Sequence, residues 1–201
     1  IHFRLVLPQP GNVAPDWPQT GANGQTVWPR GDKALHRPVY TVRAADAAQG
    51  WLDLDIFDHA GGRAVDWART ATPGASIGLL GPSGGGIPQA ASLVLAGDET
   101  AYPAMARIVE SRRDGDETVV FLLGTRDAYP MPRPPGLRLY HLPGGVPALA
   151  ARLRQTPPAA HSYLWMAAEK SGIEALRKLV FGPLGHDRAL THLSAYWQGK
   201  D

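Results

Sequence analysis

The chain has no cysteine among its 201 residues, which excludes disulfide bonds, iron–sulfur clusters and zinc–thiolate sites. No run approaches the roughly 18 apolar residues of a membrane-spanning helix, so we expect no membrane insertion. Charged residues make up only 19% of the chain and the net charge is +2. No dense run of lysine and arginine is interleaved with aromatic residues, so nucleic acid is not an expected partner. Any redox chemistry must therefore depend on a bound organic cofactor.

Histidine is present but scattered. No two of the seven histidines stand at helical ligand spacing beside a carboxylate. We therefore expect no resident metal. The absence of cysteine is compatible with the cytoplasm, and we expect a cytoplasmic monomer.

Residues 1–87 carry mainly β patterns, separated by turns rich in glycine and proline. Strands are expected over 1–7, 38–44, 51–57 and 76–80, with a short helix over 64–68. Ile1 falls inside the first of these patterns, so we expect that residues before it are missing. This half is expected to be an antiparallel β-barrel that lacks its first strands.

Residues 88–201 alternate apolar strands with amphipathic helices. Strands are expected over 92–96, 118–123, 137–141, 162–167 and 190–197, with helices over 99–112, 146–154 and 169–181. Such alternation predicts an α/β domain with a doubly wound parallel sheet, which binds ligands at the carboxyl ends of its strands.

The stretch Tyr40-Thr41-Val42-Arg43, with Arg37 upstream, has the side chains that a flavin needs. An aromatic ring can pack on the isoalloxazine, a hydroxyl can hydrogen-bond its N5 edge, and a guanidinium can bind a pyrophosphate. Alternating tyrosine and threonine are also ordinary in strands.

Two glycine-containing segments are candidate cofactor sites. His59-Ala60-Gly61-Gly62 precedes the short helix, where backbone and free N–H groups can approach a phosphate. Gly97, Asp98, Glu99 and Thr100 follow an apolar strand, where a nicotinamide dinucleotide would lie. The two acids there would repel a pyrophosphate, and they could instead cap a helix. A helix cap is therefore as good an interpretation of this segment as a cofactor site.

These segments, in this order, resemble the siderophore-interacting protein family of FAD-dependent, NAD(P)H-using ferric-siderophore reductases. The matching segments are Tyr40 to Arg43, Gly61 to Ala68, Pro73 to Gly84, Leu95 to Arg107, Trp165 to Glu169, and Ala195-Tyr196-Trp197. The resemblance spans the chain. It implies a ferredoxin-reductase-like fold, with an FAD-binding barrel in 1–87 and an NAD(P)H-binding domain in 88–201.

The resemblance also implies site residues. Thr41 and Trp197 are the expected catalytic residues, for the N5 hydrogen bond and for the flavin face that nicotinamide enters. The expected cofactor-binding residues are Arg37, Tyr40, Thr41, Val42, Arg43, His59, Gly61, Gly62, Ala64, Trp67, Gly97, Asp98, Glu99, Thr100, Arg126, Tyr196 and Trp197. Arg126, after the second parallel strand, is where a ribose 2′-phosphate of NADPH could lie.

The implied reaction is hydride transfer from NAD(P)H to flavin, then electron transfer to Fe(III) held by a siderophore. The chain departs from the family pattern at Arg63, which replaces a proline, and at Asp66, near a usual serine. Arg37 precedes Tyr40 by three positions instead of two, so Arg37 or Arg43 is the expected pyrophosphate ligand. A flavin reductase with another acceptor, and a non-enzymatic flavin- or siderophore-binding module, remain alternatives.

Overall fold

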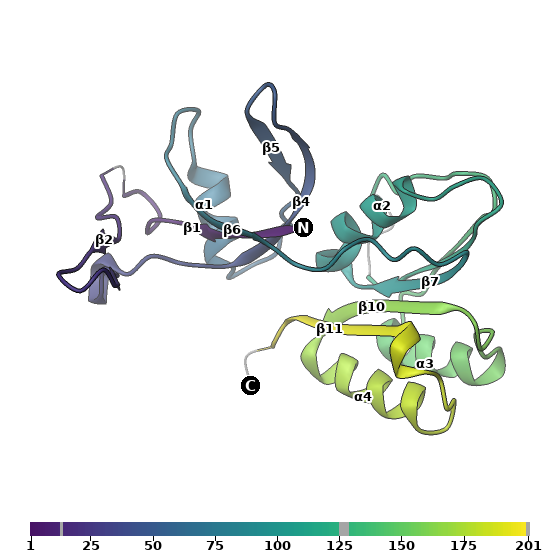
Figure 1. Cartoon of the computed structure of the whole chain (residues 1–201). Coiled ribbons are helices and arrows are strands. Elements are labelled where there is room, and N and C mark those ends of the chain that lie inside the picture. Colours follow the sequence, from purple (N-terminus) through teal and green to yellow (C-terminus); the bar gives the residue numbers. More distant parts are fainter. Residues whose placement is uncertain (13, 125–128, 200–201) are drawn as a thin grey trace. The chain divides into compact units, whose positions relative to one another are not determined.

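The computed structural model describes residues 1–12, 14–124 and 129–199, and the chain divides into two compact units (Figure 1). The N-terminal unit is Ile1–Gly86 and the C-terminal unit is Ile87–Asp201. The expected division lay after residue 87. Within the described residues, no helix is long and apolar enough to cross a membrane.

The N-terminal unit is built on a four-stranded antiparallel sheet with the order β5-β4-β1-β6. Its strands β2 and β3 pair separately as a short ribbon. The elements are β1 (His2–Val6), β2 (Gln19–Thr20), β3 (Thr26–Val27), the 3-10 helix η1 (Gly31–Lys33), β4 (Val39–Asp46), β5 (Trp51–Leu54), α1 (Arg63–Thr70) and β6 (Gly78–Ser83).

The core of this unit lies between β1 and α1. Leu5, Leu7 and Ala64 are buried together. Four half-buried side chains pack against them: Tyr40, Leu54, Trp67 and Ile77. Helix α1 therefore seats its first turn on the sheet, which fixes the helix N-terminus beside β4.

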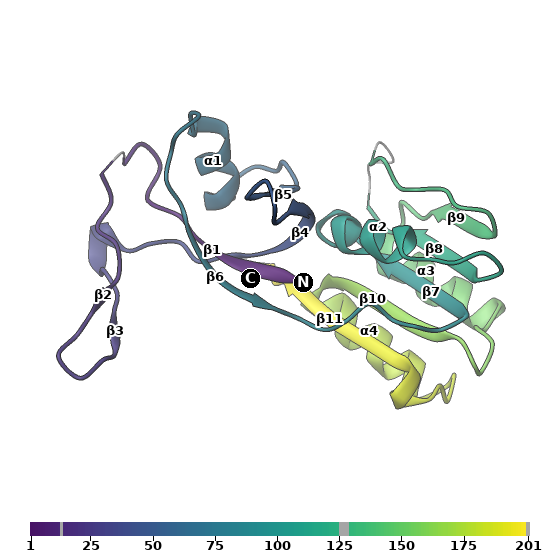
Figure 2. The ribbon, with the colours of Figure 1, turned by 45° about the horizontal axis from the view of Figure 1, so that its top comes forward.

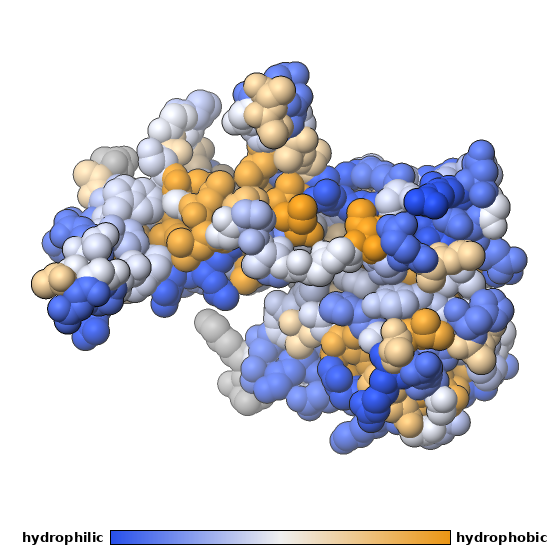
Figure 3. Space-filling view, viewed as in Figure 1, coloured by the Kyte–Doolittle hydropathy of each residue, from blue (hydrophilic) through white to orange (hydrophobic). Residues whose placement is uncertain are grey.

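Apolar side chains also remain on the surface of the N-terminal unit. Val39 and Trp51 are 48% and 44% exposed, and Leu79 and Leu80 of β6 are 42% and 41% exposed. Figure 3 shows apolar surface gathered over the part of this unit that carries β1 and β6 in Figure 1. The sheet thus presents more apolar surface than its own small core covers.

The C-terminal unit is a five-stranded parallel sheet with the order β11-β10-β7-β8-β9. Helix α2 packs on one face, and α3 and α4 pack on the other (Figure 2). The elements are β7 (Ser92–Gly97), η2 (Glu99–Ala101), α2 (Tyr102–Glu110), β8 (Glu117–Leu122), β9 (Leu137–His141), α3 (Gly145–Gln155), β10 (Tyr163–Glu169), α4 (Lys170–Phe181), η3 (Arg188–Leu190) and β11 (Thr191–Trp197).

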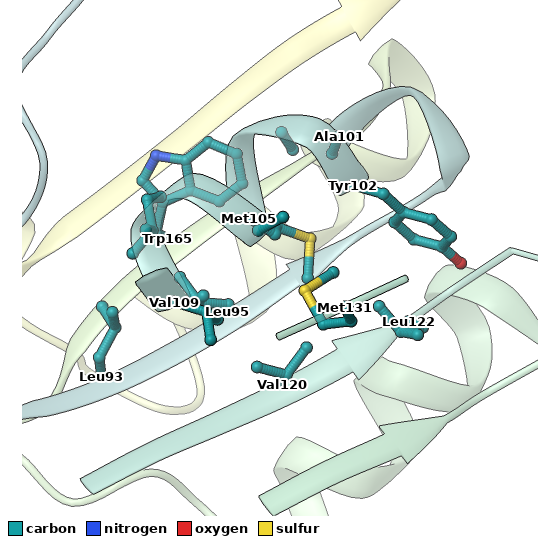
Figure 4. Packing of buried hydrophobic residues seen from close by; sticks show 13 residues of the cluster. Leu93, Leu95, Ala101, Tyr102, Met105, Val109, Val120, Leu122, Met131 and Trp165 are labelled. Atoms are coloured by element: carbon teal, nitrogen blue, oxygen red, sulfur yellow. The ribbon is translucent and has the colours of Figure 1, made fainter. Parts of the chain in front are cut away.

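Strand β7 is apolar from Leu93 to Ala96 because both of its faces are covered. Leu93 and Leu95 join the cluster beneath α2, whereas Val94 and Ala96 join the cluster beneath α3 and α4. Figure 4 shows Met105 of α2 lying over the strands in the first cluster. A parallel strand buried on both sides needs such a continuous apolar run.

The expected fold is confirmed: an antiparallel sheet is followed by a doubly wound parallel domain. Most element boundaries shift by a few residues, and two of the shifts have a physical reason in the structure. The helix expected over 99–112 is a 3-10 turn followed by α2, because Pro103 occupies the first turn of α2 and lacks the N–H of a helix interior. Strand β5 ends at Leu54 rather than at 57, because its pairing with β4 stops at Val42.

Candidate functional site

Tyr40 lies in β4 with its ring half-buried against the core of Leu5, Leu7 and Ala64. Burial raises the pKa of the Tyr40 phenol, so the side chain stays neutral near neutral pH. Packing holds the ring in one orientation beside α1. The structure thus brings Tyr40 and Ala64, both expected cofactor-binding residues, into one cluster.

Thr41, Val42 and Arg43 follow Tyr40 along β4. Because side chains alternate along a strand, Tyr40 and Val42 point to one face and Thr41 to the other. Val42 is buried, so its side chain is part of the core. The pairing of β4 with β5 shifts register between Val42 and Ala44, so this alternation does not extend through Arg43. The Arg43 Nε lies 3.9 Å from the Asp55 Oδ2. Thr41 is therefore not on the face that carries Tyr40.

Arg37, the alternative pyrophosphate ligand, precedes β4. Its guanidinium carbon lies 4.4 Å from the centre of the Trp28 ring, a cation–π contact. Its backbone oxygen accepts a hydrogen bond of 2.9 Å from the Arg4 Nη1. Arg37 and Arg43 thus both have neighbours within the unit, and neither contact decides which of them binds a phosphate.

Helix α1 begins after two glycines, and a larger residue would fit less well at either position. Gly61 has a φ of +76°, which favours glycine. A Cβ on Gly62 would come within 2.8 Å of the His59 ring. Gly62 is the N-cap of α1, and no side chain among the described residues caps it. The first N–H groups of α1 are therefore available to an external anion.

Positive charge accompanies this helix start. Arg63 is the exposed first residue of α1. Burial, and secondarily the charge of Arg63, lower the pKa of His36. At the next turn, Asp66 lies 3.9 Å from the Arg69 Nη1, which offsets its carboxylate. The Arg63 guanidinium and the free N–H groups form a donor set that fits a diphosphate, and the glycines let the backbone approach it closely.

His59 and Trp67 flank the same helix. The His59 ring is exposed, stacks on Phe57 at 6.0 Å between centroids, and lies 3.0 Å from the Ala60 oxygen. Trp67 packs half-buried against the core. His59 therefore lies at the start of α1, and Trp67, farther along the helix, packs α1 onto the core.

At the carboxyl edge of the parallel sheet, the direction in which strands are added reverses between β7 and β10. This position is the switch point of the sheet. The chain runs from β7 to β8 and β9 on one side, then returns to place β10 on the other side of β7. Ligands of doubly wound sheets bind in the crevice at this point. Asp98 directly follows β7 and Glu169 ends β10, so both acids stand at the switch point.

Asp98 accepts four hydrogen bonds at this edge. Its Oδ1 accepts from the backbone N and the hydroxyl of Thr100, at 3.1 and 2.5 Å. Its Oδ2 accepts from the Glu169 backbone N at 3.0 Å and from the Trp197 Nε1 at 2.8 Å. The carboxylate therefore caps η2 and also joins three strand ends.

Glu99 lies against the end of β8. A Cβ on Gly124 would come within 2.6 Å of the Glu99 carboxylate atoms. The Gly124 N donates to the Tyr102 hydroxyl at 2.9 Å, and the Gly124 oxygen lies 2.7 Å from the His141 Nε2. Burial is the main cause that raises the pKa of Tyr102 to about 12. Tyr102 and His141 thus hold the backbone of Gly124 by hydrogen bonds, and the Glu99 carboxylate lies against it.

Two family models match the chain in the order of its two units. The model for the siderophore-interacting FAD-binding domain matches residues 1–86, and the model for the siderophore-interacting protein matches residues 90–200. The chain belongs to the siderophore-interacting protein family. The resemblance predicted from the sequence motifs is thereby confirmed.

The chain is similar in sequence to proteins named for ferric-chelate reduction and for mycobactin import. The NADPH-dependent ferric-chelate reductase of Escherichia coli (strain K12) is 30% identical over 211 residues, covering 99% of this chain and 80% of the relative. The mycobactin import ATP-binding/permease protein IrtA of Mycobacterium tuberculosis is 28% identical over 178 residues. That match covers 84% of this chain but only 21% of IrtA.

The fold is also that of a solved family member. The siderophore-interacting protein SipS from Aeromonas hydrophila superposes with a TM-score of 0.77 at 24% identity. The superposition covers 100% of this chain and 79% of SipS. At this level of identity the likeness establishes the fold and nothing finer.

The remaining expected site residues lie at the end of β11 or beyond the described residues. Tyr196 and Trp197 are 39% and 47% exposed. Tyr196 packs edge-on against Trp165, with 6.1 Å between ring centroids. Arg126, the expected contact for a 2′-phosphate, lies outside the described residues.

Sequence reasoning missed two residues at the carboxyl edge. Glu169 caps α4 by accepting from the backbone N of Ser171 at 2.6 Å and of Gly172 at 3.2 Å. Its position between a strand and a helix start was the available signal. His141, which contacts Gly124 from the end of β9, had no local signal, because the contact spans 17 positions.

Proposed function

We propose that this chain is a FAD-dependent ferric-siderophore reductase that takes its electrons from NADPH. The observation that carries the proposal is the uncapped start of α1 with Arg63, packed beside Tyr40 in the unit that matches the FAD-binding model. The name of the Escherichia coli relative supports NADPH and a ferric chelate. A cytoplasmic location and a monomeric state remain predictions.

In this proposal FAD, when bound, accepts electron pairs from NADPH and passes them singly to chelated Fe(III). The chain's residues bind and orient. The N–H groups at Gly62 and Arg63 hold the diphosphate, and the half-buried Tyr40 gives the flat ring system a rigid neighbour. Thr41 offers a hydroxyl from the opposite face of β4. A second phosphate contact comes from Arg37 or from Arg43 in this proposal. Substituting each arginine separately by alanine distinguishes the two.

The C-terminal unit receives NADPH at the switch point between β7 and β10. Asp98 and Glu169 do not contact its phosphates in this proposal, because their carboxylates carry the same charge as the phosphates and accept hydrogen bonds from the chain instead. Arg126 remains the proposed contact for the 2′-phosphate. Reduction of Fe(III) weakens its binding by the hard oxygen ligands of a siderophore, so the iron is released as Fe(II). This step needs no acid or base from the protein.

Anaerobic mixing of the full chain, loaded with FAD, tests the proposal. We expect NADPH to bleach the visible flavin absorbance, and a ferric siderophore added next to restore it while ferrozine detects Fe(II). Bleaching without Fe(II) would instead identify a reductase with another acceptor. Binding of FAD without bleaching would identify a non-enzymatic module. Ferric siderophore mixed with NADPH alone, without protein, is the blank.

A further inference from the structure

Trp197 is held at the switch point by one hydrogen bond rather than by burial. Its side chain is 47% exposed, yet its Nε1 donates to the Asp98 Oδ2 at 2.8 Å. Strand β10 lies between β7, which precedes Asp98, and β11, which carries Trp197. Asp98 therefore reaches across a whole strand to fix an aromatic ring that the core does not enclose.

The strand register aims Trp197 at Asp98. Along β11, Ala195 pairs with Ala168, but the next pair is Trp197 with Glu169, so Tyr196 is an extra residue. Such a bulge redirects the side chain that follows it, and bulges are frequent beside functional sites. The Glu169 Oε1 also accepts from the Gly199 N at 3.4 Å, just beyond Trp197. The end of β11 is thus held by two hydrogen bonds beyond the bulge.

Resting on the proposed function, we infer that Asp98 is a positioning residue that holds the Trp197 indole as a contact surface for the nicotinamide half of NADPH. The reasoning is spatial. The crevice at the switch point is where a dinucleotide binds in such sheets, and the fixed indole stands in it. A half-exposed ring without this bond would lose its fixed orientation, because packing alone does not hold it.

Substitutions at Asp98 and Trp197 form a graded series of variants. Asp98→Ala removes the acceptor for Trp197. Asp98→Asn keeps one acceptor oxygen, which can still face the Trp197 Nε1. Its amide nitrogen then faces the Thr100 hydroxyl, which can rotate to accept, and the Thr100 backbone N, which loses its acceptor. Trp197→Phe removes the N–H while leaving a ring and all other Asp98 contacts. Asparagine should therefore rescue part of what alanine loses.

Nuclear magnetic resonance of the indole N–H groups tests the positioning directly, without FAD or NADPH. The Trp197 signal is assigned by its loss in Trp197→Phe. We expect that signal to shift upfield and exchange faster with water in Asp98→Ala, and to shift less in Asp98→Asn. The matched control is Asp187→Ala, because Asp187 caps η3 through the Ala189 N as Asp98 caps η2. An unmoved Trp197 signal in Asp98→Ala overturns the inference.

Stopped-flow reduction of the FAD-loaded chain by NADPH tests the functional part. We expect Asp98→Ala and Trp197→Phe each to slow bleaching on the order of tenfold to a hundredfold, with the double variant no slower than the single ones. Electron delivery to a ferric siderophore, after chemical reduction of the flavin, should be unchanged. Trp51→Phe, which alters a tryptophan that is 44% exposed in the other unit, is the control.

Three results would contradict the functional part. Additive losses would mean that Asp98 and Trp197 act separately. Equal slowing of both half-reactions would mean a general structural defect. Tighter NADPH binding in Asp98→Ala would mean that the indole blocks the crevice. If the wild-type chain takes no electrons from NADPH, the proposed function fails, and the resonance shift still decides whether Asp98 holds Trp197.

Discussion

Arg63→Ala is expected to weaken FAD binding roughly tenfold to a hundredfold, the range that loss of a hydrogen bond to a charged group produces. Arg63 stands at the first position of a helix whose N–H groups no described side chain caps. A diphosphate at this point interacts with the guanidinium and with the helix dipole together. Arg63→Glu should weaken binding further, because it adds repulsion. Titration of FAD by quenching of flavin fluorescence measures both.

Arg69→Ala is the matched control for Arg63, because Arg69 lies in the last turn of the same helix. It forms ion pairs with Asp58 and Asp66 and lies away from the first N–H groups of the helix. We expect its loss to weaken FAD binding far less than Arg63→Ala does, through the Asp66 charge alone. If Arg63→Ala also binds normally while Arg43→Ala or Arg37→Ala fails, the diphosphate lies with the arginines around β4, and the assignment to α1 is wrong.

Gly97→Ala is expected to destabilise the C-terminal unit by about 1–3 kcal/mol, the usual cost of overpacking a core. A Cβ on Gly97 would lie 2.6 Å from the Ala101 Cβ, 2.8 Å from the Ala167 oxygen and 2.9 Å from the Met105 Sδ. The carbonyl belongs to the neighbouring strand, so backbone must move. Gly97 is thus a packing glycine that lets η2 and α2 approach β7, whatever its role toward NADPH. Urea unfolding followed by circular dichroism measures the change.

Gly86→Ala provides the comparison for Gly97. Among the described residues nothing lies within 4 Å of a Cβ placed there, and its φ is not in the left-handed region. We expect little change in stability, since the alanine also restricts the unfolded chain. Equal stability of Gly97→Ala and the wild type would show that the strand and helix are less tightly packed than their contacts indicate.

The layout of the C-terminal unit could be predicted because each element carries its own pattern. The run Leu93–Ala96 is apolar on both faces, as a covered parallel strand must be. The strand expected over 51–57 was too long because pairing, not composition, ends β5 at Leu54. Local pattern thus predicts the elements, whereas the partner strand sets their ends.

The site was less predictable, because its contacts join distant residues. The sequence left open whether the acids at Asp98 and Glu99 serve a cofactor or a helix cap. The structure gives Asp98 a cap and a second bond to Trp197, which is 99 positions away. No local spacing encodes that contact, nor the extra residue at Tyr196 that makes it possible. The family motifs identified Trp197 only by its place near the chain end.

Titration of the purified full chain with FAD tests the central claim most directly, because everything proposed depends on a flavin held by residues 1–86. We predict saturable binding of one FAD per chain, visible as a shifted and quenched flavin spectrum, and weakened far more by Arg63→Ala than by Arg69→Ala. A wild-type chain that is folded by circular dichroism and leaves the FAD spectrum unchanged at saturating concentration would contradict the account.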